Sequence, residues 1–136
     1  MITSVCANPA IDKAVLVDGF KVGTINRIDE WRADASGKGI NVAISSKRLG
    51  AQVTCIGFNF SDNGHLECER LQSEGIEYDF IYSPGSIRTN IKIIDRKTGV
   101  MTELNEKGEA VSADAIKQLE TIVAEKAAKS SFMVFA

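Results

Sequence analysis

The sequence of 136 residues has little of what several classes of protein need. It has one histidine, His65, and three cysteines that are far apart and include no Cys-x-x-Cys pair, so it lacks zinc-ligand spacing. The odd cysteine count and the lack of a secretion signal predict reduced thiols in a cytoplasmic protein, with Cys6 and Cys55 buried in strands. No apolar run approaches the ~20 residues that span a bilayer. The net charge of −2 argues against a nucleic-acid or membrane-surface partner.

What the sequence does have is an alternation of short apolar runs and amphipathic stretches. The apolar runs predict strands at residues 2–7, 13–17, 24–33, 53–58, 76–82, 88–95, 100–105 and 132–135. The stretches between them predict helices at residues 39–49 and 62–74, and one that begins after Ser112. This alternation is typical of an α/β fold with a parallel sheet. We interpret residues 132–135 as a central strand buried on both faces, and therefore expect the first part of a longer protein. The alternative is a complete small α/β domain.

The motif Ser-Gly-Lys-Gly-Ile-Asn-Val-Ala at residues 36–43 opens one of these helices. A glycine turn at a helix start leaves N–H groups unpaired and directs the positive end of the helix dipole outward, which favours an anion such as phosphate. Lys38 adds a full positive charge, and Asn41 offers a donor and an acceptor from the first turn. The spacing matches neither a Walker A loop nor the dinucleotide fingerprint. The alternative is an ordinary strand-to-helix turn with a solvated lysine.

Polar side chains share one face of the strand that begins near Arg88. Because successive strand residues point to opposite faces, Arg88, Asn90 and Lys92 lie together, which suits an anionic, hydroxylated ligand. The alternative is a solvated sheet face that blunts edge pairing. Asp12, which follows an Asn-Pro-Ala-Ile segment at the end of the first strand, is a candidate acceptor for sugar hydroxyls or a cap of the local turn.

Taken together, these segments resemble the N-terminal part of the ribokinase-like, phosphofructokinase-B-type sugar kinases, most closely the branch of 1-phosphofructokinases and tagatose-6-phosphate kinases. The matching segments are residues 8–12 (Asn-Pro-Ala-Ile-Asp), 36–43, 49–50 (Leu-Gly), 88–92 (Arg-Thr-Asn-Ile-Lys) and 102–108 (Thr-Glu-Leu-Asn-Glu-Lys-Gly). The resemblance implies an α/β fold: a ribokinase-like parallel sheet with helices on both faces and a small β-sheet lid, incomplete at its C-terminus. Residues 1–136 would be the N-terminal part of one kinase domain, with lid strands at about 13–35 and 86–106.

The resemblance also implies transfer of the γ-phosphoryl group of ATP, with Mg²⁺, to fructose 1-phosphate, which gives fructose 1,6-bisphosphate. The residues that it assigns to substrate binding are Asp12, Gly37, Lys38, Asn41, Arg88, Asn90 and Lys92. Of these, Asp12 would hold sugar hydroxyls, and Arg88 the phosphate that the substrate already carries. Members of this branch often dimerise through their lids, so we expect a homodimer. Tagatose 6-phosphate, fructose 6-phosphate and an unphosphorylated sugar are the alternative substrates.

Two departures from the family pattern and one missing motif accompany the resemblance. The family usually has glycine at the position of Ser36, whose side chain would crowd the close approach of backbone to ligand, and often proline at that of Lys107. The family's catalytic aspartate lies in a Gly-Ala-Gly-Asp motif, which these residues do not contain. We therefore assign no catalytic residue and no metal ligand to this chain, and expect it to carry the sugar-phosphate side of the site. The other alternative is a non-catalytic sugar-phosphate-binding domain.

Overall fold

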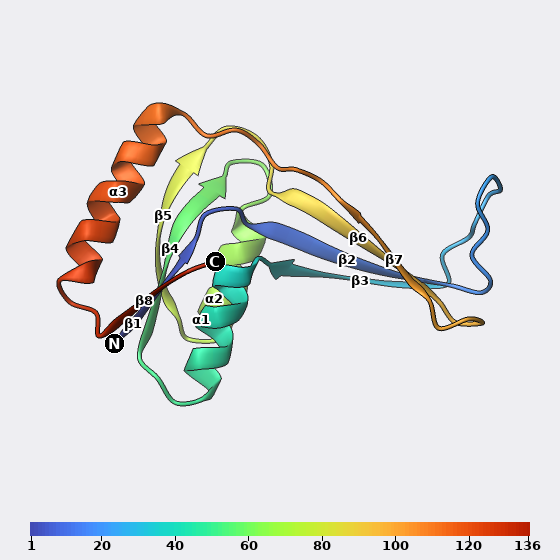
Figure 1. Ribbon diagram of the computed structural model, residues 1–136, viewed down its shortest axis with the longest axis horizontal. Coiled ribbons are helices and arrows are strands. Elements are labelled where there is room, and N and C mark those ends of the chain that lie inside the picture. Colours follow the sequence, from blue (N-terminus) through green and yellow to red (C-terminus); the bar gives the residue numbers. More distant parts are fainter.

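The computed structural model describes residues 1–136, which form two four-stranded sheets, with helices packed on the first (Figure 1). The first sheet contains β1 (Ile2–Cys6), β4 (Val53–Phe60), β5 (Glu77–Ser83) and β8 (Phe132–Phe135). Its strands are all parallel and run in the order β5-β4-β1-β8. The inner strand β4 is buried along its whole length, as expected in a parallel sheet that is covered on both faces.

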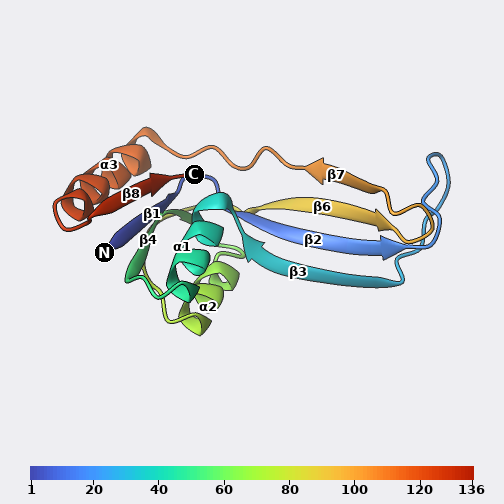
Figure 2. The same ribbon diagram turned by 60° about the horizontal axis from the view of Figure 1, so that its bottom comes forward.

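Helices cover both faces of the first sheet (Figure 2). The helices are α1 (Lys38–Arg48), α2 (His65–Ser73) and α3 (Ala113–Ala127). On one face, Ile40 of α1 and Leu71 of α2 join a core cluster that includes Cys55 of β4. On the other face, Leu119 of α3 packs in a cluster with Ile56 of β4. Removal of these apolar side chains from water is the main favourable contribution to such a fold. None of the three helices combines the length and the apolar character that a membrane-spanning helix needs.

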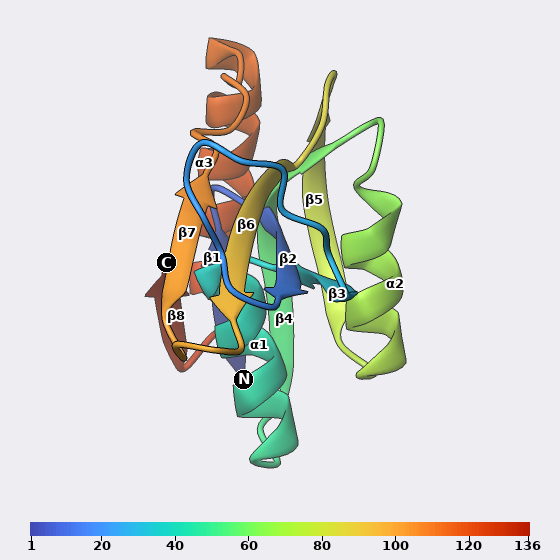
Figure 3. The same cartoon turned by 90° about the vertical axis from the view of Figure 1, so that its right-hand side faces the viewer.

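The second sheet is mixed and extends away from the first (Figure 1), so that it points towards the viewer in Figure 3. Its strands, in spatial order, are β3 (Glu30–Ser36), β2 (Ala10–Val17), β6 (Arg88–Asp95) and β7 (Met101–Asn105). The inner strands β2 and β6 are parallel, and both edge strands are antiparallel to their neighbours. Because side chains alternate along a strand, one face carries Asp12 and Lys92 while the other carries Val15, Ile91 and Ile93. The sheet therefore has one polar face and one apolar face.

The predicted α/β class, the parallel sheet, the helices on both faces and the second sheet are confirmed. Ser112 caps α3, since its Oγ accepts a hydrogen bond of 3.1 Å from the N–H of Ala115. Cys6 and Cys55 are buried, as expected, and His65 is exposed at the start of α2.

Three predictions about strands are wrong in detail. The strand expected at 24–33 lies at Glu30–Ser36, because its partner β2 ends at Val17 and the register pairs Leu16 with Glu30. Residues 132–135 form β8, which pairs with β1 at one end of the sheet, but they are not buried on both faces, since Phe132 and Phe135 are exposed. Asp12 lies inside β2, because a new strand starts directly after the break at residues 8–9.

Candidate functional site

The parallel pairing of β2 with β6 brings three of the predicted site residues together. Asp12 lies opposite Asn90, and Lys92 lies two residues further along the same face. Asn90 Nδ2 donates a hydrogen bond of 3.0 Å to Asp12 Oδ1, and Lys92 Nζ lies 2.8 Å from Asp12 Oδ2. Both oxygens of the Asp12 carboxylate are therefore held by β6, and the carboxylate has a fixed orientation.

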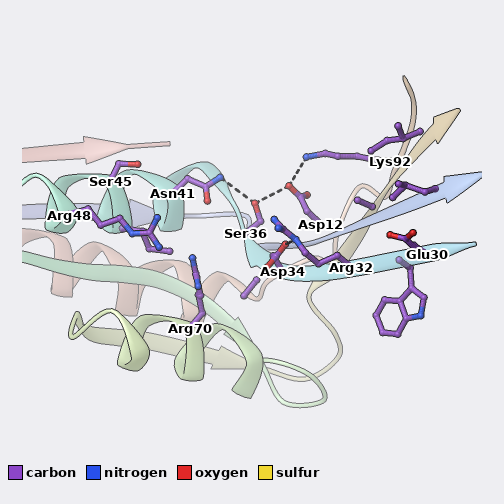
Figure 4. Close-up of a pocket in the computed structure, with 16 residues that line it drawn as sticks. Asp12, Glu30, Arg32, Asp34, Ser36, Asn41, Ser45, Arg48, Arg70 and Lys92 are labelled. Carbon is purple, nitrogen blue, oxygen red and sulfur yellow. Dashed lines mark hydrogen bonds and ion pairs between the residues drawn. The ribbon is translucent and has the colours of Figure 1, made fainter. Parts of the chain in front are cut away.

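The glycine turn adds two further side chains to this network (Figure 4). Ser36 is the last residue of β3, Gly37 caps α1, and Asn41 lies in the first turn of that helix. Ser36 Oγ donates to Asp12 Oδ2 at 3.1 Å and accepts from Asn41 Nδ2 at 3.3 Å. The result is a continuous set of hydrogen bonds that links α1, β3, β2 and β6.

The network keeps Asp12 ionised. Burial alone would raise the pKa of this carboxyl group, but hydrogen bonds from Lys92, Asn90 and Ser36 outweigh it and hold the pKa below its usual range. The same contact with Asp12 raises the pKa of Lys92. The pair therefore carries one negative and one positive charge at neutral pH.

Of these side chains, Asp12, Ser36, Asn41 and Lys92 line an open cavity of about 720 Å³ between the polar face of the second sheet and helices α1 and α2 (Figure 4). Asn41, Ser45 and Arg48 line it from one stripe of α1, at helical spacing, and Arg70 lines it from α2. A volume of this size is in the range of small-molecule sites. Its wall offers acceptors, donors and cations, which suits a ligand with both hydroxyl and anionic groups.

The two glycines of the turn are required for different reasons. Gly37 has a φ of +117°, a conformation that L side chains rarely adopt. Gly39 lies so close to β1 that a Cβ there would come within 2.6 Å of the Cys6 Cα. The N–H groups of Ile40 and Gly39 face the Cys6 thiol, whose pKa burial nevertheless raises to about 12. At this helix start the side chain of Lys38 is exposed.

Arg88 lies at the end of the polar face, away from the Asp12 network. Its guanidinium donates to the carbonyl oxygen of Glu106 at 3.1 Å and to that of Pro9 at 3.4 Å. It does not line the cavity that contains Asp12, and neither does Lys38. The structure therefore brings Asp12, Asn41, Asn90 and Lys92 together and leaves Gly37, Lys38 and Arg88 around the edge of this group.

Sequence reasoning missed the contacts of Ser36 and the cations of the cavity wall. Ser36 stood out only as a departure from glycine, whereas the structure places its side chain in the network with Asp12. Arg48 and Arg70 carried no motif; both are ion-paired to Glu74 where α1 and α2 end. No group of three or more His, Cys, Asp or Glu side chains is placed to hold a metal ion.

Three comparisons with known proteins agree on the relatives of this chain. A family model described as pfkB family carbohydrate kinase matches residues 5–136. The chain is 31% identical over 135 residues to the 1-phosphofructokinase of Vibrio cholerae. The alignment covers 99% of this chain and 42% of that enzyme. It is 36% identical over 107 residues to the 1-phosphofructokinase of Rhodobacter capsulatus, in an alignment that covers 79% of this chain and 34% of that enzyme. The chain thus spans less than half the length of these curated relatives.

Solved structures share the fold. A Thermotoga maritima protein described as a possible 1-phosphofructokinase superposes with a TM-score of 0.88 at 29% identity, over 98% of this chain and 43% of that one. Phosphofructokinase-2 from Escherichia coli, solved in complex with fructose-6-phosphate, superposes with a TM-score of 0.89 at 23% identity, over 99% of this chain and 44% of that one. The fold is therefore ribokinase-like, and the match of the family model to nearly the whole sequence shows that this chain belongs to the pfkB family of carbohydrate kinases.

Proposed function

We propose that this chain carries the sugar-phosphate side of a kinase that transfers the γ-phosphoryl group of ATP to fructose 1-phosphate. Among curated relatives, the enzymes named 1-phosphofructokinase are 31–36% identical to it. The observation that carries the proposal is the ionised, fully oriented Asp12 in the wall of an open cavity, bonded to Lys92, Asn90 and Ser36. A carboxylate held in this way is an acceptor for sugar hydroxyls.

The phosphate that the substrate already carries needs cations separate from Lys92, which is committed to Asp12. We assign it to Arg88, whose fork of N–H donors suits phosphate, and to Lys38 at the start of α1. Arg88 uses some of its five donors on the carbonyl oxygens of Pro9 and Glu106. These bonds hold its side chain in one orientation and leave other donors for a ligand.

ATP and Mg²⁺ are part of the proposal, as donor and cofactor of this family of kinases. None of the residues described above is assigned to either of them. The role proposed for these residues is limited to binding and orienting the acceptor sugar, because phosphoryl transfer depends mainly on positioning and on charge around the transferring group.

A second copy of the chain is the proposed partner, through the second sheet. The face of that sheet opposite Asp12 has an apolar groove of about 250 Å³, lined by residues that include Val15, Ile91, Ile93 and Leu104. Leu104 is 56% exposed, so a matching apolar face would remove it from water.

A coupled assay on the full-length protein tests the proposed function. We expect the highest kcat/KM for fructose 1-phosphate and lower values for tagatose 6-phosphate, fructose 6-phosphate and fructose. A higher value for one of the other sugars would reassign the substrate within the family. Binding of sugar phosphate without any ATP-dependent turnover would instead favour the non-catalytic binding domain. Asp12→Asn should lose most of the activity, because the amide replaces an acceptor with a donor.

A further inference from the structure

The side-chain amide of Asn63 makes two hydrogen bonds to the backbone of one distant residue, Ile87. The N–H of Ile87 donates to Asn63 Oδ1 at 2.7 Å, and Asn63 Nδ2 donates to the carbonyl oxygen of Ile87 at 3.2 Å. Asn63 lies in the turn between β4 and α2, whereas Ile87 lies just before β6, where the chain passes from the first sheet to the second (Figure 1). One side chain therefore joins the layers of the first sheet to the start of the second.

These two bonds satisfy backbone groups that have no other partner. Ile87 is buried, with 2% of its surface exposed, and packs with Ile11 and Phe60. It precedes β6, whose pairing with β2 begins at Arg88, and none of the backbone hydrogen bonds of the turns and loops reaches it. Buried N–H and C=O groups need partners, and Asn63 supplies both, as a neighbouring strand would.

The bond to the Ile87 carbonyl oxygen also fixes the backbone from which Arg88 starts. The C=O of Ile87 and the N–H of Arg88 belong to one planar peptide unit, so a donor that holds the oxygen sets the direction in which the Arg88 side chain leaves the backbone. At the other end of that side chain, the guanidinium donates to the carbonyl oxygens of Pro9 and Glu106. Asn63 thus holds the base of the side chain whose far end is available for a ligand.

The turn before α2 also contacts residues 84–87, which link β5 to β6, at a second point nearer β5. Ser86 Oγ donates to Asp62 Oδ2 at 3.0 Å, and both side chains are exposed. This contact tethers the link to the turn, whereas the Asn63 contact involves the peptide unit that carries Arg88. Substitutions can therefore separate general tethering of the link from control of Arg88.

We propose that Asn63 is a positioning residue of the sugar-phosphate site, which sets, through the peptide between Ile87 and Arg88, where the Arg88 guanidinium meets the phosphate of the substrate. The inference rests on the proposed function and deepens it, because it adds a residue beside the first sheet to a site on the second. The role needs an amide, since Asn63 has both a donor and an acceptor for Ile87, whereas an aspartate has only acceptors and an alanine has neither. Without the donor, the peptide unit is free to rotate and the guanidinium is displaced from the phosphate.

The test uses the full-length protein, with fructose 1-phosphate as the probe and a double-mutant cycle with Arg88→Ala. Asn63→Ala removes both hydrogen bonds, and Asn63→Asp keeps the acceptor for the Ile87 N–H while it loses the donor. Ser86→Ala is the matched control, because it removes a bond between the same two segments without altering the peptide of Arg88. The two readouts are steady-state kinetics for both substrates and the NMR signal of the Arg88 Nε–H in the ligand-free protein.

We expect both Asn63 variants to raise the KM for fructose 1-phosphate roughly tenfold, with kcat and the KM for ATP little changed, as loss of ground-state binding predicts. In the Arg88→Ala background each should add less than about twofold, because the residue through which Asn63 acts is gone. Ser86→Ala should leave both KM values unchanged. In the ligand-free protein, the Arg88 Nε–H signal should shift or broaden in both Asn63 variants and stay as in the wild type in Ser86→Ala.

A merely structural role gives a different pattern, because a smaller folded fraction lowers kcat and leaves KM unchanged. That result overturns the proposal, as does a tenfold effect that persists in the Arg88→Ala background or that also appears in Ser86→Ala. If the wild-type protein neither binds nor phosphorylates the sugar phosphate, the proposed function fails. The ligand-free signal then decides the role of Asn63 by itself: a displaced Arg88 signal in the Asn63 variants supports the positioning role, and an unmoved one refutes it.

Discussion

Lys92 reaches diagonally across two parallel strands to Asp12. Its Cα lies opposite Ala14 in the register of β2 and β6, yet its Nζ lies 2.8 Å from Asp12 Oδ2. The position opposite Asp12 is taken by Asn90, which bonds to the other carboxylate oxygen. The two β6 side chains therefore hold the carboxylate from two directions, which an isolated ion pair could not do.

Replacement of Lys92 by methionine should weaken sugar-phosphate binding with little loss of stability. Both partners of the pair are partly exposed, with 32% and 24% of their side-chain surface accessible, so the contribution to folding should stay below about 1 kcal/mol. Without the cation, the pKa of Asp12 should rise and its orientation should loosen. The expected result is a higher KM for the sugar phosphate at an almost unchanged melting temperature. Lys97→Met, which removes an exposed pair with Asp18 of 3.6 Å, is the control and should change neither.

Arg88→Ala should raise the KM for the sugar phosphate while the KM for ATP changes little. Loss of a charge-assisted contact costs roughly 1.5–3 kcal/mol, or about 10- to 100-fold in KM. Because Arg88 also holds the carbonyl oxygens of Pro9 and Glu106, melting curves must accompany the kinetics. Arg88→Lys keeps the charge but not the fork of donors and should recover only part of the loss. Equal effects on both substrates would place Arg88 outside the sugar-phosphate site.

Local patterns predicted most of the elements and singled out several of the candidate site residues. Alternation along residues 88–92 placed Asn90 and Lys92 on one face, and the glycine turn marked the start of α1. Which strand would lie beside them is not a local property. The parallel pairing of β2 with β6 joins segments far apart in the chain, and it decides that Asp12 meets Asn90.

Two features had no reliable signal. The contacts of Ser36 depend on the register of β3 against β2 and on the angle at which α1 leaves the turn. In α2, 39% of Leu66 is exposed, whereas the neighbouring Glu67 is fully buried, which is the reverse of what their side chains favour. A rotation of the helix about its axis by one residue is enough to exchange the buried and exposed positions of Leu66 and Glu67. Packing against the sheet, rather than the local sequence, decides which rotation the helix adopts.

Gly39→Ala should destabilise the fold, although alanine is the better helix former. The gain in helix propensity is about 1 kcal/mol. A Cβ at this position would lie 2.6 Å from the Cys6 Cα and 2.8 Å from its N, both backbone atoms of β1 that cannot move aside cheaply. Overpacking of this kind typically costs 1–3 kcal/mol, so we expect a net fall in the free energy of unfolding, measured by urea denaturation. Ser45→Ala, on the exposed side of the same helix, should leave the fold slightly more stable; an equal gain for Gly39→Ala would contradict the close packing.

Leu104→Glu should shift the protein from dimer to monomer if the second sheet is the interface. Leu104 is exposed beside the apolar groove, and a carboxylate there would have to lose its hydration in a buried interface. Light scattering after size exclusion measures the mass directly. Leu49→Glu is the matched control, since Leu49 follows α1 and is 89% exposed away from this groove. A wild-type monomer, or a dimer that Leu104→Glu leaves intact, would remove the second sheet as the interface.

Glu67 should make the stability of the protein depend on pH. It is fully buried in α2, neither carboxylate oxygen has a hydrogen-bond partner, and burial raises its pKa from 4.5 to about 8. A negative charge on Glu67 would raise the pKa values of Cys6 and Cys55 in the adjoining strands and of Tyr82 in β5. Neither carboxylate oxygen is hydrogen-bonded to a cation, and burial is the one cause of the raised pKa, so only the protonated form is well accommodated.

The sign of the effect follows from the two protonation states. Between pH 4.5 and about 8 the folded chain keeps a proton at Glu67 that the unfolded chain has released, so rising pH favours unfolding. The stabilisation that comes from keeping this proton is complete below pH 4.5 and is lost by about pH 8. Across that range the free energy of unfolding falls by roughly 1.4 kcal/mol per pH unit. Glu67→Gln resembles the protonated acid and should remove this slope, so its advantage over the wild type should grow from pH 5 to pH 8 in urea denaturation. Glu120→Gln, exposed on α3, is the control and should follow the wild-type profile. A constant difference between Glu67→Gln and the wild type over this range would mean that Glu67 is ionised in the folded protein.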